Sequence, residues 1–201
     1  MNTQEKQITK IGNINIGYSC PPVIIAEIGQ SHLGNLKKTK EIIKKISKTG
    51  VEFIKFQTHI ADEESTLDEP FRKRISKYKN RMDYWKKMEF TLYEWNQISQ
   101  FCKKNKLVFL SSPFSIKAVE ILKKIKVPAW KIGSGEFFST SMIKKILSYK
   151  EPIILSTGLS TLAEISKMVK LFKNNNKKFV LMQCTSQYPC KIEDIGINII
   201  D

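Results

Sequence analysis

The sequence predicts an α/β fold: a (β/α)8 TIM barrel, incomplete here, with about six βα units and an N-terminal β-hairpin. Short apolar runs alternate with segments of helical periodicity, which is typical of parallel strands joined by right-handed crossovers. Nearly every strand turns polar at its carboxyl end, as in a barrel, whereas an open sheet concentrates its site at one switch point. The chain has 201 residues, fewer than the roughly 250 of a typical barrel.

The first predicted elements are a β-hairpin and, after it, one complete βα unit. Residues 8–16 alternate apolar and polar side chains around Gly12-Asn13, the pattern of a β-hairpin, which Pro21-Pro22 ends. A continuous apolar run at 23–29 predicts the first barrel strand, and residues 36–49 have helical spacing with lysines between the apolar positions. A second strand is predicted at 53–58.

A long polar insertion at 61–88 delays the next helix. It is dense in charge and in aromatic residues, including Phe71, Tyr78, Tyr84 and Trp85. Because such a segment is unlike a linker, we expect an ordered excursion over the site.

The remaining elements repeat the strand and helix alternation. The helix predicted at 91–105 opens with Thr91 and Glu94, the spacing of a capping box, and Thr161 and Glu164 repeat this spacing. The further helices are expected at 115–125, 139–149 and 161–173, and the strands at 107–110, 129–132, 152–155 and 179–183.

Composition excludes several classes of function. The net charge of +15 invites a nucleic-acid reading, but the lysines are scattered along helical faces and no RNA-binding signature accompanies them, so we expect no nucleic-acid partner. No apolar run approaches the roughly 18 residues of a membrane span, and the N-terminus is unlike a secretory signal. We therefore expect a cytoplasmic protein with reduced cysteines, since its four cysteines form no C-x-x-C pair.

The polar strand ends predict an anion site with a base beside it. Lys55 and Gln57 lie two apart on one strand and so share a face, and Lys131 precedes the glycine-flanked turn Gly133-Ser134-Gly135-Glu136. Two lysines and the serines of neighbouring strands suit a small phosphate-carboxylate. The alternatives are outer-face lysines and a turn whose glycines serve geometry alone.

Glu27 and Glu136 are the acidic residues of these strand ends and are the candidates for general acid–base chemistry. A structural ion pair between Glu27 and Lys55 is the alternative for the first of them. The two histidines, His32 and His59, lie in loops past the first two strands; neither has an obvious carboxylate partner, so we favour loop hydrogen bonding over metal ligation.

Six motifs in order together resemble the sialic acid synthase family, which includes N-acetylneuraminate synthase and its pseudaminate and legionaminate synthase relatives. They are Ile25-Ala26-Glu27-Ile28-Gly29-Gln30-Ser31-His32-Leu33-Gly34, Lys55-Phe56-Gln57-Thr58, Ser111-Ser112-Pro113-Phe114, residues 130–136, Leu155-Ser156-Thr157-Gly158 and Gln183-Cys184-Thr185-Ser186-Gln187-Tyr188-Pro189. The sequence departs from the family at Ser31, where asparagine is common, and at Ser186, where some members carry asparagine, which leaves the identity of the sugar open.

The resemblance implies a transferase that condenses phosphoenolpyruvate with an N-acetylated hexose, N-acetylmannosamine or a bacterial diacetamido hexose, to a nine-carbon 2-keto acid and phosphate. It implies catalytic roles for Glu27, Lys55, Lys131 and Glu136, phosphoenolpyruvate binding by Lys55, Lys131, Ser134, Ser156 and Ser186, and sugar binding by Glu27, Phe114, Glu136 and Tyr188. It also implies a divalent metal, Mn2+ or alternatively Mg2+, and a homodimer at full length.

The family's metal ligands lie beyond Asp201, as does its C-terminal domain, so we expect no metal ligand within this chain. The expected organisation is a lead-in at 1–22 and a partial barrel at 23–201, truncated after the sixth strand and inactive or nearly so by itself. The alternatives are another phosphoenolpyruvate-condensing barrel that acts on an aldose phosphate, and a non-catalytic remnant.

Overall fold

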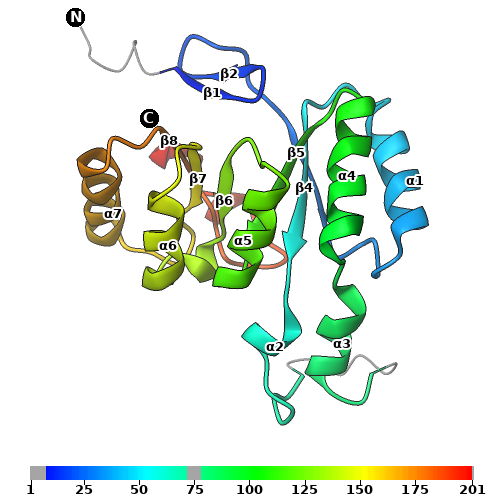
Figure 1. Cartoon of the computed structure of the whole chain (residues 1–201). Helices are drawn as coiled ribbons and strands as arrows, with labels where there is room; N and C mark the ends of the chain where they lie inside the picture. Colours follow the sequence, from blue (N-terminus) through cyan, green and yellow to red (C-terminus); the bar gives the residue numbers. More distant parts are fainter. Residues whose placement is uncertain (1–7, 72–77, 201) are drawn as a thin grey trace, which may run out of the picture. The chain divides into compact units, whose positions relative to one another are not determined.

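The structure, a computed structural model, describes residues 8–71 and 78–200. The chain forms two compact units (Figure 1). One unit spans Pro22–Val127, and the other combines Met1–Pro21 with Pro128–Asp201. Each unit contains a three-stranded parallel sheet with helices connecting its strands, so the predicted alternation of strands and helices is confirmed.

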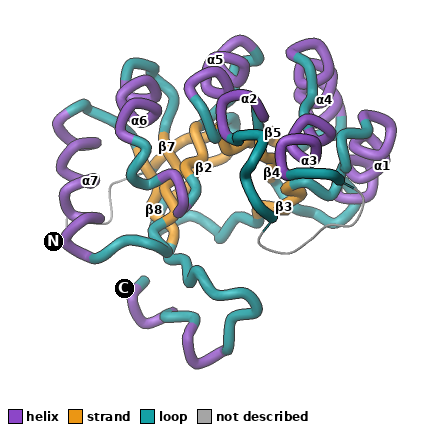
Figure 2. Tube along the Cα trace, turned by 90° about the horizontal axis from the view of Figure 1, so that it is seen from below, coloured by secondary structure: helices purple, strands orange, loops and turns teal. Residues whose placement is uncertain are grey.

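The unit of residues 22–127 is built on the sheet β3-β4-β5, with strands β3 (Ile25–Gly29), β4 (Phe53–Thr58) and β5 (Val108–Pro113). Helices α1 (Leu36–Ile46) and α4 (Leu92–Lys104) connect these strands, and α5 (Ile116–Lys124) follows β5. Helices α1 and α4 lie side by side (Figures 1 and 2). Phe56 packs its ring against Trp95 of α4 and Phe109 of β5, and this aromatic core holds the middle strand in place.

The insertion after β4 contains helices α2 (Ala61–Glu64) and α3 (Arg81–Met88). Its base is closed by hydrogen bonds, because the Ala61 N–H donates to the Glu89 carboxylate at 2.5 Å and the Ile60 N–H to Glu64 at 2.7 Å. Arg81 pairs with Glu69 and lies over the Trp85 ring. The expectation of an ordered segment is confirmed for its described residues, with 72–77 outside them, and its position over the site stays a prediction.

The other unit contains the predicted hairpin, β1 (Thr9–Ile11) and β2 (Ile14–Ile16), with Gly12 at φ 60° in the turn. Its parallel sheet joins β6 (Trp130–Ile132), β7 (Ile153–Ser156) and β8 (Phe179–Met182). Helices α6 (Thr140–Leu147) and α7 (Leu162–Asn174) connect these strands, and 3-10 turns occupy Ser134–Glu136, Ile192–Asp194 and Ile197–Ile199. The assignment of domains at 1–22 and 23–201 stays a prediction.

Local boundaries differ from the sequence reading for identifiable reasons. Both capping boxes form as predicted, at Thr91 with Glu94 and at Thr161 with Glu164. Strand β5 extends past Leu110 because Ser111 and Ser112 continue the ladder with β4. Helix α1 ends at Ile46, before the Ser47–Thr49 turn that leads to Gly50 at φ +85°.

No helix within residues 8–71 and 78–200 has the length and apolar character needed to span a bilayer.

Candidate functional site

In the unit of residues 22–127, Lys55 is the centre of the polar strand ends. Its position on the middle strand buries it to 8% exposure. Its Nζ lies 2.6 Å from Glu27 Oε2 on β3 and donates to Ser112 Oγ on β5 at 3.3 Å. The Glu27–Lys55 ion pair therefore forms, while the Glu27 side chain keeps 49% of its surface exposed. A buried ammonium with a serine and an accessible carboxylate around it suits an anionic ligand.

Gln57 continues the same face of β4, as its spacing from Lys55 predicts. Its Oε1 lies 3.3 Å from His59 Nε2 and 3.5 Å from the Gln30 Nε2 donor. A Cβ added at Gly29 would lie 3.8 Å from the Gln57 amide nitrogen and 3.7 Å from a Glu27 oxygen. Gln57 and Glu27 thus both border the turn after β3.

His59 has a carboxylate partner, and the expectation that it lacks one is wrong. Its Nδ1 lies 2.6 Å from Glu64 Oε2 in α2. The ring stacks on Trp85 of the insertion at 4.1 Å between centroids and on Phe114 at 4.0 Å. The five-residue separation of His59 and Glu64 would have predicted their contact only together with a helix at the start of the insertion. No helix was predicted there from the sequence.

His32 is fully buried, and its Nδ1 accepts a hydrogen bond from the Gly34 N–H at 3.0 Å. Burial first, and then the electrostatic effects of the neighbouring His59 and Lys38, lower the pKa of His32 from 6.5 to about 4. Both histidines therefore form hydrogen bonds, as the sequence analysis expects for these loops. Across residues 8–71 and 78–200, no cluster of three histidine, cysteine or acidic side chains could hold a metal ion.

In the other unit, Lys131 occupies the corresponding place on β6. It is 5% exposed, and its Nζ donates to Ser156 Oγ at the end of β7 at 2.5 Å and to the Ile132 carbonyl at 3.2 Å. A lysine buried at a strand end in contact with a neighbouring serine suits an anionic ligand, and the anion site itself stays a prediction. The outer-face alternative does not hold for Lys131 or for Lys55, because both are buried.

The glycine-flanked turn after β6 folds as a 3-10 turn from Ser134 to Glu136. Ser134 Oγ accepts the Gly158 N–H at 3.1 Å, and Glu136 accepts a hydrogen bond from the Ser139 hydroxyl at 2.5 Å. A Cβ at Gly133 or Gly135 would meet nothing within 4 Å, so the backbone of this turn is open to a ligand.

Gly158 is the residue whose role the sequence reading missed. A Cβ there would lie 2.6 Å from Ser186 Oγ and 2.8 Å from the Cys184 carbonyl. Only glycine lets the loop after β8 approach the loop after β7 so closely. That approach brings Ser186 toward the Ser134–Gly158 hydrogen bond, whereas the Tyr188 side chain is fully exposed. Contact of Tyr188 with a sugar stays a prediction.

Lys55 and Lys131 belong to different units, and the expectation that both face one ligand stays a prediction. Within each unit, the assignment of residues to phosphoenolpyruvate or to the sugar also stays a prediction.

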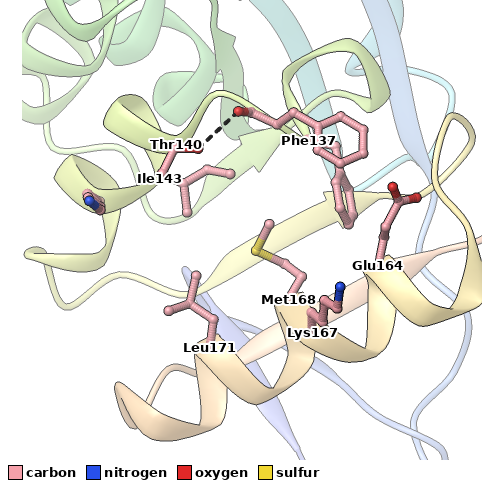
Figure 3. A pocket seen from close by; sticks show the side chains of 9 residues that line it. Phe137, Thr140, Ile143, Glu164, Lys167, Met168 and Leu171 are labelled. Carbon is pink, nitrogen blue, oxygen red and sulfur yellow. Dashed lines mark hydrogen bonds between the residues drawn. The ribbon is translucent and has the colours of Figure 1, made fainter.

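A separate apolar groove of about 480 Å³ lies between α6 and α7 (Figure 3). Phe137, Ile143, Met168 and Leu171 line it, with Glu164 and Lys167 at its edge. None of the predicted site residues contributes to its lining, so the groove is distinct from the polar strand ends.

Comparisons with known proteins agree with the resemblance seen in the sequence. The chain is 32% identical over 183 residues to pseudaminic acid synthase of Helicobacter pylori, covering 88% of this chain and 54% of that protein. It is 28% identical over 188 residues to human N-acetylneuraminate-9-phosphate synthase, covering 92% of this chain and 52% of that protein. The chain therefore spans about half the length of the curated relatives it matches.

Solved structures support the same assignment. The crystal structure of N-acetylneuraminic acid synthetase from Leptospira borgpetersenii, in complex with citrate, matches with a TM-score of 0.84 and 28% identity over 96% of this chain and 65% of that one. A truncated 3-deoxy-D-arabino-heptulosonate 7-phosphate synthase from Thermotoga maritima, at 13% identity over 88% of this chain and 56% of that one, shares the fold with a TM-score of 0.63. The predicted partial TIM barrel is confirmed. Because the NeuB family matches residues 42–201, most of the sequence, the chain belongs to the NeuB family.

Proposed function

We propose that the protein in which this chain occurs condenses phosphoenolpyruvate with an N-acetylated hexose, N-acetylmannosamine or a bacterial diacetamido hexose. The products are a nine-carbon 2-keto sugar acid and phosphate. The observation that carries the proposal is the buried Lys131 ammonium in contact with Ser156 beside the open Ser134–Glu136 turn, in a chain whose relatives are named as sialic, pseudaminic and legionaminic acid synthases.

The buried lysines suit the charge of phosphoenolpyruvate. Lys55 and Lys131 would attract its phosphate and carboxylate, and the hydroxyls of Ser134, Ser156 and Ser186 would accept or donate hydrogen bonds to the same groups. Few waters compete with an ammonium that is less than a tenth exposed, which strengthens its interaction with an anion.

The sugar would lie against Glu27, Phe114, Glu136 and Tyr188. Carbon 3 of phosphoenolpyruvate attacks the sugar aldehyde, water adds at carbon 2, and the bond from carbon 2 to the phosphate oxygen breaks with release of phosphate. Glu27 and Glu136 are the carboxylates assigned to the proton transfers, the first within reach of Lys55 and the second oriented by Ser139.

A divalent metal, Mn2+ or Mg2+, is part of this proposal, but the described residues do not fit one. Neither His32 nor His59 belongs to a cluster of three candidate ligands, in the part of the chain that the structure describes. We therefore assign no metal ligand to these residues and no chemical step to a metal here.

We also propose a cytoplasmic homodimer without nucleic-acid or membrane partners. Because the chain spans about half the length of its relatives, the activity is proposed for the whole protein, and the 201-residue chain by itself is expected to release little phosphate.

The test is a phosphate-release assay on the whole protein in which this chain occurs, with phosphoenolpyruvate, Mn2+ and a panel of acceptors. An N-acetylated hexose should release phosphate and form a 2-keto acid in equal amounts, and omission of the sugar should stop both. Release with an aldose phosphate instead would support the alternative condensation, and no release with any acceptor would support a non-catalytic remnant.

A further inference from the structure

His59 connects the insertion to the polar strand ends of its unit. Its ring is sandwiched between Trp85 of α3 and Phe114 after β5, with interplanar angles of 24° and 21°. The residue is only 6% exposed, and stacking on both faces fixes the plane of the ring. Phe114 is in turn held by His59, and Phe114 is one of the residues assigned to the sugar.

The two ring nitrogens of His59 have different partners. A carboxylate only accepts hydrogen bonds, so Nδ1 donates to Glu64 Oε2. The other oxygen of Glu64 accepts the Ile60 N–H at 2.7 Å, which fixes the carboxylate at the start of α2. Nε2 lies 3.3 Å from the Gln57 side-chain carbonyl and donates to it when the ring carries a proton on both nitrogens.

This arrangement fixes the orientation of the Gln57 carboxamide. Its Oε1 faces His59 and the Gln30 amide, and its Nε2 therefore lies on the side of Gly29 and Glu27. We propose that His59, held by Glu64 between Trp85 and Phe114, is a positioning residue that orients Gln57 and Phe114 toward the acceptor sugar. This inference rests on the proposed function.

The expected effect is a selective loss of acceptor binding. His59→Phe keeps a ring between Trp85 and Phe114 but removes both hydrogen bonds, and we expect it to raise the KM for the sugar about tenfold or more. The KM for phosphoenolpyruvate should stay within about twofold, since Lys131 and Ser156 belong to the other unit and the Lys55 ammonium is held by Glu27 and Ser112, not by His59 or Gln57. His59→Gln, whose amide can still reach Gln57, should recover part of the sugar KM.

Ile98→Ala is the control for lost stability. Ile98 is fully buried in α4 and contributes to none of these hydrogen bonds, so this variant should lower the melting temperature and leave both KM values unchanged. An unchanged sugar KM in His59→Phe would overturn the inference. Equal rises of both KM values in His59→Phe would overturn it as well.

A second measurement stands even if the proposed function fails. In the 201-residue chain, the side-chain amide signals of Gln57, assigned by their loss in Gln57→Glu, should be resolved in NMR spectra and should shift and broaden in His59→Phe but not in Ile98→Ala. Absence of phosphate release by the whole wild-type protein would refute the proposed function alone. Unchanged Gln57 signals in His59→Phe would refute the positioning role.

Discussion

At the scale of single residues, burial gives His32 a pH-dependent contribution to stability. Its pKa of about 4 lies below the ordinary value of 6.5, so the unfolded chain binds a proton there that the folded chain does not. The folded state should therefore lose on the order of 3 kcal/mol as the pH falls from 6.5 to 4.

Urea unfolding of the wild type and of His32→Asn at several pH values measures this contribution. Asparagine can still accept the Gly34 N–H but does not titrate, so its stability should fall less between pH 6.5 and pH 4. Ile43→Val, at a fully buried apolar position, should keep the wild-type pH slope while lowering stability. Parallel slopes for the wild type and His32→Asn would contradict the assignment.

Site residues could be predicted where their position is anomalous. Lysines inside apolar strands need a reason to be there, and this anomaly identified Lys55 and Lys131. The role of Gly158 depends on a loop approaching from a distant part of the sequence, and the partner of His59 depends on a helix in the insertion. Such contacts are set by tertiary packing, which periodicity does not encode.

At the scale of elements, the capping box of α4 should contribute measurably to stability. Thr91→Ala removes the side chain that accepts the Glu94 N–H, and we expect a cost of about 1 kcal/mol. Asn96→Ala, at an exposed position within the same helix, should be neutral or slightly stabilising because alanine has the higher helix propensity. Urea denaturation midpoints measure both; equal effects would show that the cap contributes nothing of its own.

The loop before α1 should require glycine at position 34 mainly because a side chain there would clash, and only secondarily because of its positive φ. A Cβ at Gly34, at φ +64°, would lie 1.7 Å from the Lys87 carbonyl near the end of α3. Gly34→Ala should therefore cost about 3 kcal/mol or more, since backbone must move to admit the methyl group.

Gly50→Ala is the matched control for this clash. Gly50 also has a positive φ, +85°, but a Cβ there would meet nothing within 4 Å. The control should cost only the conformational strain, about 1–2 kcal/mol. Similar unfolding free energies for the two variants would show that α3 yields to the added methyl group.

At the scale of the whole molecule, the order of elements could be predicted because each βα unit is a local pattern of apolar runs, caps and turns. The capping boxes and the exact bounds of β4 followed from the sequence. The division into compact units at Pro22 and after Val127 could not be predicted, since it depends on how densely contacts gather between distant segments. The net charge of +15 describes the surface and gave no information about the reaction.

The central claim is that the buried lysine of β6 binds phosphoenolpyruvate for the condensation. Phosphate release by Lys131→Met in the whole protein, compared with the wild type and with Lys10→Met at an exposed position of the hairpin, measures it most directly. Methionine keeps most of the side-chain volume and removes the charge, so kcat/KM for phosphoenolpyruvate should fall at least about a hundredfold, while Lys10→Met should match the wild type. Undiminished phosphate release by Lys131→Met would contradict the claim.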